Sequence, residues 1–171
     1  MYKKYFCLLS LFLIIISGCD KGIEPEPETK SGPTGFGGKI TFLGNWPDSI
    51  KRTHIVVFKN QIQNSQDFFP PNLSFVVDSI PYKSAEFTYN SFEDNFYPIF
   101  QLTPGEYSYV VVAQSKTPEL SLERKDWFVV GVYSQNGDQS KPTVLKLSAG
   151  EITGNVNIVV DFNNPPPQPP M

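Results

Sequence analysis

The chain has 171 residues, and its 14 Lys and Arg against 17 Asp and Glu give a formal net charge of −3 at pH 7. An acidic chain does not suit binding to nucleic acid or to an anionic headgroup surface, because both carry negative charge. The single histidine and the two cysteines leave few side chains for nucleophilic catalysis or for a histidine-rich metal site.

The first 18 residues have the features of a secretory signal peptide. Lys3 and Lys4 provide a positive start, and Tyr5–Ile16 is apolar apart from Ser10. This run is shorter than the about 20 apolar residues that a transmembrane helix needs, and small residues follow it. We therefore predict that residues 1–18 are removed from the mature protein.

The apolar run ends in Ile16-Ser17-Gly18-Cys19, which resembles the bacterial lipobox, with Ile16 where leucine is commonest. The resemblance implies cleavage between Gly18 and Cys19, and acyl chains such as palmitate on the sulfur and amine of Cys19. One acyl chain holds a protein only marginally to a bilayer, whereas two or more anchor it stably. We expect a lipid-anchored protein of the cell envelope, at the outer membrane, with the periplasmic or surface face left open.

Removal of the signal peptide changes what the folded part contains. Cys7 leaves with it and Cys19 is acylated, so no free thiol remains for a disulfide, a metal site or a nucleophile. Loss of Lys3 and Lys4 leaves 12 basic against 17 acidic residues, a formal charge of −5. The mature domain is expected to stand away from an anionic membrane surface.

Residues 19–35 are predicted to form a flexible, acidic linker that contains proline. Glu24–Glu28 reads EPEPE, and proline favours an extended polyproline conformation. At roughly 3.1 Å per residue, the spacer Asp20–Gly35 reaches about 50 Å from the lipid.

Residues 36–162 alternate apolar and polar positions in the way that is typical of β-strands. THIVVFKN has apolar residues on both faces, so this strand is predicted to be covered on both sides. Only residues 117–126, TPELSLERKD, favour a helix, with Thr117 as its cap and Pro118 in its first turn. Turns separate the runs and predict one all-β domain, an antiparallel β-sandwich of seven to nine strands. The expected strands lie in GKITFLG, THIVVFKN, LSFVVDS, SAEFTYN, YPIFQL, GEYSYVVVAQ, DWFVVGVYS, PTVLKLS and GNVNIVVDF.

Four segments in this order, GKITFLGNWP, LTPGEYSYVVVA, DWFVVGVY and VNIVVDF, resemble the prealbumin-like, carboxypeptidase-regulatory-type β-sandwich. More narrowly, they resemble uncharacterised lipoproteins of the Bacteroidetes and Ignavibacteria that carry this sandwich. The resemblance extends from about Gly37 to Phe162. It implies a prealbumin-like fold and an accessory role, and this group has no established activity that could be carried over to the chain.

The residues of the domain offer little for catalysis or for metal binding. His54, at the start of a strand, is expected to be a sheet-edge residue, since nucleophilic catalysis needs a base beside the nucleophile. The acidic segments SFEDNF and QNGDQS lack the Asp-x-Asp-x-Asp spacing that wraps a calcium ion. We predict no catalytic residue, no metal ligand, and no cofactor apart from the covalent lipid at Cys19. An enzyme stays a third hypothesis, because sequence alone does not place two carboxylates across a cleft.

Aromatic residues are the remaining candidates for ligand binding. Trp46, in GNWPDS, and Trp127, in DWFVV, are the two candidate stacking residues, because flat rings beside polar side chains bind sugars. The alternative is that these rings plug the open ends of the sandwich, and we favour it for Trp46. Further aromatic residues gather around one long connection: Tyr82, Tyr89, Phe92, Phe96 and Tyr97.

Residues 163–171, NNPPPQPPM, form a proline-rich tail. Proline cannot enter a helix interior or a sheet ladder, so an extended tail is the favoured interpretation. A ligand for a proline-reading groove is the alternative. The predicted function of the whole protein is a non-catalytic binding or scaffold module that is anchored to a membrane. Its expected partner is an envelope protein, with a glycan as the alternative and nucleic acid excluded.

Overall fold

The structure is a computed structural model, and it describes residues 31–77, 79–94, 101–134 and 136–171. The predicted signal peptide, Cys19 and most of the linker therefore lie outside the described residues. Among the helices of the described part, none has both the length and the apolar character that a membrane crossing requires.

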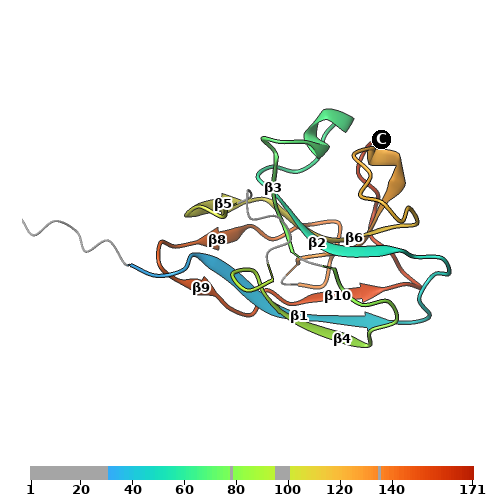
Figure 1. The fold of residues 1–171 in the computed structure, drawn as a ribbon, viewed down its shortest axis with the longest axis horizontal. Coiled ribbons are helices and arrows are strands. Elements are labelled where there is room, and N and C mark those ends of the chain that lie inside the picture. Colours follow the sequence, from blue (N-terminus) through green and yellow to red (C-terminus); the bar gives the residue numbers. More distant parts are fainter. Residues whose placement is uncertain (1–30, 78, 95–100, 135) are drawn as a thin grey trace, which may run out of the picture.

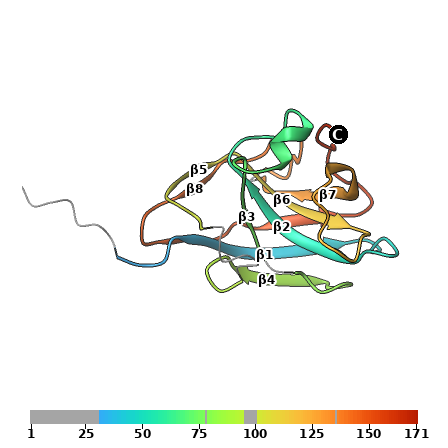
Figure 2. The same cartoon turned by 45° about the horizontal axis from the view of Figure 1, so that its top comes forward.

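Two sheets face each other across an apolar core (Figure 1). The first sheet has the order β10-β1-β4, formed by Ile158–Asp161, Gly35–Leu43 and Glu86–Asn90, and β9 (Ile152–Thr153) pairs with the start of β1. The second has the order β3-β2-β6-β7, formed by Leu73–Val76, Arg52–Phe58, Tyr109–Ser115 and Trp127–Val132. β5 (Gly105–Tyr107) and β8 (Leu145–Leu147) form a third, two-stranded sheet. The turned view separates the layer of β1 and β4 from that of β2, β6 and β7 (Figure 2).

The predicted all-β sandwich is confirmed, with two corrections to its details. The first sheet is mixed rather than antiparallel, because β1 pairs in parallel with both β9 and β10. The described part also holds ten strands, more than the seven to nine expected, because GEYSYVVVAQ divides into β5 and β6 and because β9 was not expected. Most of YPIFQL, another expected strand, lies outside the described residues. Alternation marks which faces of a strand are buried, but it carries no information on the direction of the neighbouring strand.

The helix predicted for residues 117–126 is wrong. Its only helical part is η2, a 3-10 turn at Arg124–Asp126, and the other helical element of the described chain is a 3-10 turn, η1, at Ser65–Phe68. The hydroxyl of Thr117 does not cap a helix but lies 2.8 Å from the hydroxyl of Ser115, the last residue of β6. Side chains that bond to local backbone or hydroxyl groups compete with helix formation, and this segment has several.

The β3-β2-β6-β7 sheet has apolar residues on both of its faces. Ile55 and Val57 on β2 point into the core between the sheets, whereas Val56 and Phe58 belong to a second apolar cluster on the outer face. Ile62, Phe68 and Leu120, from the two long connections above the sheet, cover this second cluster. The prediction that THIVVFKN is covered on both faces is therefore confirmed. By contrast, the outer face of the first sheet is open to solvent, and the side chains of Lys39, Leu43 and Val159 are exposed on it.

His54 is not the sheet-edge residue that was predicted. It lies on β2, which has a neighbouring strand on each side, and its side chain is fully buried. Its Nδ1 is 3.1 Å from the carbonyl oxygen of Val77, and its ring centroid is 5.9 Å from that of Trp127. The imidazole is thus part of the packing of the outer cluster.

Two buried tyrosines make the protein sensitive to alkaline pH. Burial raises the pKa of Tyr109 to about 12 and raises the pKa of Tyr89 further still. Below pH 10 both side chains are neutral in the folded and the unfolded chain, and above it only the unfolded chain loses these protons. Each tyrosine is therefore expected to lower the free energy of unfolding by about 1.4 kcal/mol per pH unit above pH 10. For Tyr109 the loss ends near pH 12.

Urea unfolding at pH 8 and pH 11, with the wild type and Tyr109→Phe, measures this effect. Because phenylalanine cannot titrate, the variant is expected to lose about 1.4 kcal/mol less than the wild type between the two pH values. An equal loss in the two proteins would show that Tyr109 already ionises normally in the folded state.

Candidate functional site

Four aromatic side chains form a cluster at one end of the sandwich, and we call Phe42, Trp46, Tyr82 and Phe162 the far-end cluster. The Trp46 ring lies at its centre, with centroid distances of 4.6 Å to Phe42, 5.3 Å to Phe162 and 5.6 Å to Tyr82. Its Nε1 donates a hydrogen bond of 2.9 Å to the carbonyl oxygen of Ser84. These contacts hold the ring in one orientation and half-bury it over the core.

Segments that are distant in the sequence supply these rings. Parallel pairing of β10 with β1 sets Asp161 beside Leu43, so that Phe162 follows directly and its backbone N–H donates to the carbonyl of Leu43. Tyr82 lies in a tight turn that closes through a hydrogen bond from the Ser84 N–H to the Pro81 carbonyl. The Tyr82 hydroxyl donates to the Pro47 carbonyl at 3.3 Å and ties this turn to the loop that carries Trp46.

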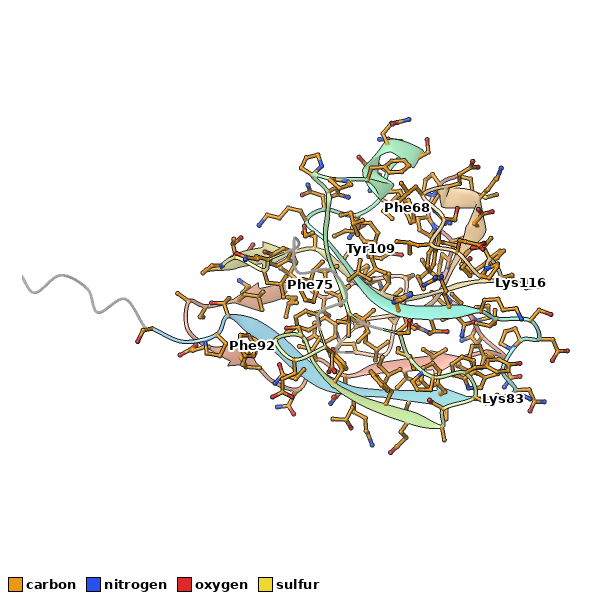
Figure 3. The ribbon with its side chains drawn as sticks, in the orientation of Figure 1. Phe68, Phe75, Lys83, Phe92, Tyr109 and Lys116 are labelled. Carbon is orange, nitrogen blue, oxygen red and sulfur yellow. The ribbon has the colours of Figure 1, made fainter. Side chains whose placement is uncertain are left out.

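The far-end cluster lies at the end of the sandwich opposite to the start of β1. The described chain enters β1 at Gly35 and leaves it at Leu43, and a nine-residue strand is about 30 Å long. Figure 3 shows Lys83, next to Tyr82, at the end where β1 finishes, and Phe92 at the end where the chain enters.

Part of the far-end cluster is open to solvent and carries backbone strain. Tyr82 is 44% exposed, and the Nζ of Lys83 lies 5.3 Å from the centroid of the Tyr82 ring. Lys83 has a φ of +66° and Ser49, in the neighbouring loop, has a φ of +67°. Turns with positive φ at such positions normally use glycine or asparagine. Two of the three non-glycine residues with positive φ in the described chain therefore flank this cluster.

Trp127, the second candidate stacking residue, has no free ring face. It is 5% exposed, and its Nε1 donates to the carbonyl of Ser121 at 2.8 Å. The ring is part of the outer apolar cluster, beneath the connection that leads from β6 to β7. A buried ring cannot stack on a sugar, so Trp127 is not available to a ligand. The structure places Trp46 and Trp127 apart, and of the two only Trp46 is partly accessible to solvent.

The acidic loops use their carboxylates within their own turns. Asp138 accepts hydrogen bonds from the N–H and hydroxyl of Ser140 and pairs with Lys141, and these contacts lower its pKa to about 2. Asp94 accepts a bond from the backbone N–H of Asn90. Within the described ranges, no three side chains of His, Cys, Asp or Glu are grouped so that they could hold a metal ion.

The aromatic residues that the sequence places around one connection do not form one site. Tyr82 belongs to the far-end cluster, Tyr89 is buried with its hydroxyl bonded to the Val156 carbonyl, and Phe92 is exposed at the linker end. Phe96 and Tyr97 lie outside the described residues. Sequence reasoning missed Phe162 as a partner of Trp46, although it placed Phe162 at the end of the expected strand GNVNIVVDF.

The geometry defines an all-β sandwich with an aromatic cluster at the end opposite to Gly35, where the described chain enters β1. Comparison with protein-family models, with curated proteins and with solved structures finds no match to this chain.

Proposed function

We propose that this chain is a lipid-anchored, non-catalytic binding or scaffold module of the cell envelope. In this proposal Cys19 carries the acyl chains, residues 19–35 bridge the distance from the outer membrane, and the far-end cluster meets a partner envelope protein. The prealbumin-like resemblance of residues 37–162 is in keeping with such an accessory role.

The position of the far-end cluster carries this proposal. An exposed tyrosine that is held by a rigid tryptophan is typical of interface hot spots, where large aromatic side chains contribute most of the binding energy. The positive φ angles of Ser49 and Lys83 support a functional interpretation of the cluster, because strained backbone conformations are common at binding sites. Distance from the tether leaves this end free to reach a partner.

Capture of the partner by the anchored protein tests the proposal. We expect the wild type to fractionate with membranes and to retain one partner after cross-linking, and Cys19→Ala to be released into the soluble fraction. Tyr82→Ala should stay with the membrane but bind the partner about thirty-fold more weakly, which corresponds to a hot spot of about 2 kcal/mol. Phe92→Ala, which removes an aromatic ring that is 62% exposed at the opposite end, is the matched control and should behave as the wild type.

Two outcomes would contradict the proposal. If Cys19→Ala still sediments with membranes, the anchor is not at that residue. If Tyr82→Ala captures the partner as well as Phe92→Ala does, the far-end cluster is not the interface.

A carbohydrate-binding accessory lipoprotein is the second candidate, and the exposed ring of Tyr82 beside Lys83 and Trp46 favours it. A glycan that stacks there would change the fluorescence of Trp46, because the two rings are in contact. The change should be saturable with envelope polysaccharide and absent in Tyr82→Ala. Trp127 serves as an internal background, since its ring is buried elsewhere.

A further inference from the structure

The proline-rich tail, residues 163–171, is docked on the domain rather than projecting from it. The side-chain amide of Gln168 bonds to both backbone groups of Val129 on β7: Val129 N–H donates to Oε1 at 3.0 Å, and Nε2 donates to the Val129 carbonyl at 2.7 Å. Pro166 and Pro169 are buried, whereas the other residues of the tail are exposed. In Figure 1 the C-terminus accordingly lies beside the connection that contains η2.

The buried positions of the tail have the spacing expected of a polyproline ligand. A polyproline II helix has three residues per turn, so positions three apart, such as 166 and 169, lie on the same face. Proline has no N–H and cannot bridge a strand, but a glutamine between prolines supplies both a donor and an acceptor. Gln168 thus provides hydrogen-bond partners for the backbone N–H and carbonyl of Val129 at the edge of β7. The segment from Pro166 to Pro169 has the spacing of a PxxP recognition motif.

Arg124 contributes a buried donor to the same place. It is 7% exposed, and its guanidinium donates to the carbonyls of Trp127 on β7 and of Pro169 in the tail. Among the described residues no carboxylate pairs with it, and its Nε has no hydrogen-bond partner. A buried cation normally has a counter-ion, so a guanidinium that is held only by carbonyls is unusual in a purely structural role.

The hold of the tail on the domain is small. After a turn in which the N–H groups of Asn163 and Asn164 donate to Asp161, the described contacts of the tail consist of one glutamine side chain, one Arg124 bond and two buried prolines. Segments with few buried apolar contacts open locally at a much lower free energy than global unfolding requires. When the tail opens, the outer edge of β7 and Arg124 become available to another extended segment.

We propose that the tail site, formed by the outer edge of β7 and Arg124, is a recognition site for a proline-rich PxxP segment of a partner protein. Residues 163–171 are its resident occupant, and the partner segment displaces them. The partner segment carries glutamine, or another residue able to pair with Val129, between its prolines. The tail site is separate from the far-end cluster, so either site can fail its test without affecting the other.

A synthetic peptide of residues 163–171, labelled at its N-terminus, tests the proposal by fluorescence anisotropy with the mature chain. The wild-type chain should bind it weakly, because its own tail competes. Gln168→Ala in the chain loosens the resident tail, and since Gln168 is exposed the fold should persist, which urea unfolding verifies. We expect this variant to bind the peptide at least ten-fold more tightly than the wild type does. A peptide that carries Gln168→Ala is the matched control and should bind at least ten-fold more weakly.

Hydrogen exchange at the Val129 amide gives an independent measurement. The amide should be protected in the wild type, exposed to exchange in the Gln168→Ala chain, and protected again when the peptide is added. Absence of peptide binding to the Gln168→Ala chain, or equal binding of the two peptides, would overturn the proposal. Concentration-dependent dimers of the wild type that vanish in Gln168→Ala would also overturn it, because a second copy would then be the occupant.

Discussion

Replacing Gly38 by alanine is expected to destabilise the protein by about 3–5 kcal/mol, through overpacking and a broken buried hydrogen bond. Gly38 lies on β1 where the chain between β9 and β10 crosses closely. A Cβ added there would lie 2.3 Å from the carbonyl oxygen of Val156, and backbone cannot yield as a flexible side chain can. The same carbonyl accepts the buried hydroxyl of Tyr89 at 2.7 Å, so moving it also breaks that bond.

Gly154→Ala is the matched control for this substitution. Gly154 belongs to the same crossing segment, but a Cβ added to it has nothing within 4 Å. Equilibrium unfolding in urea should therefore place Gly154→Ala within about 0.5 kcal/mol of the wild type. If Gly38→Ala unfolds at the same urea concentration as Gly154→Ala, the close approach of residues 154–157 to β1 is wrong.

Phe36→Ala is the second substitution with a large expected effect, a loss of about 3–5 kcal/mol. Phe36 is completely buried at the start of β1, and its ring makes edge contacts with Phe75 and Tyr89 at centroid distances of 6.4 and 5.6 Å. Because these partners come from both sheets, the cavity would open between the layers. Strands on either side limit how far the cavity left by Phe36→Ala can collapse, so we expect a loss of stability near the upper end of the 3–5 kcal/mol range, that is, about 5 kcal/mol.

Phe92→Ala removes the same side chain from an exposed position and serves as the control for Phe36→Ala. Its effect on the free energy of unfolding should be within about 0.5 kcal/mol. Similar losses for the two variants would contradict the assignment of Phe36 to the core between the sheets.

The sequence predicts the strands better than it predicts their partners. Alternation located β1, β2 and β6, and the double-sided pattern of β2 correctly predicted a strand buried on both faces. The parallel pairing of β1 with β10 could not be found in this way, because a strand carries the same alternation whichever way its neighbour runs. His54 was misplaced for the same reason, since the position of β2 within its sheet depends on pairings that the local sequence does not contain.

The site was predicted in part, and the missing part depends on topology. The interpretation of Trp46 as a plug matches its half-buried position, but its contacts with Phe162 and Tyr82 arise from segments more than 30 residues away in the sequence. The docked tail was missed because the interpretation considered only the prolines, which cannot join a sheet ladder. It did not consider that the side chain of Gln168, between them, can bond to a strand edge. Gln168 is the signal that closer reading could have used.

Lipid anchoring at Cys19 is the central claim of the proposed function, and intact mass spectrometry of the protein purified from membranes tests it most directly. We expect a mature chain that begins at Cys19 and carries the added mass of at least two fatty acyl groups, which hydroxylamine or lipase treatment reduces. A mature chain that begins at another residue, or one that begins at Cys19 without acyl mass, would contradict the claim.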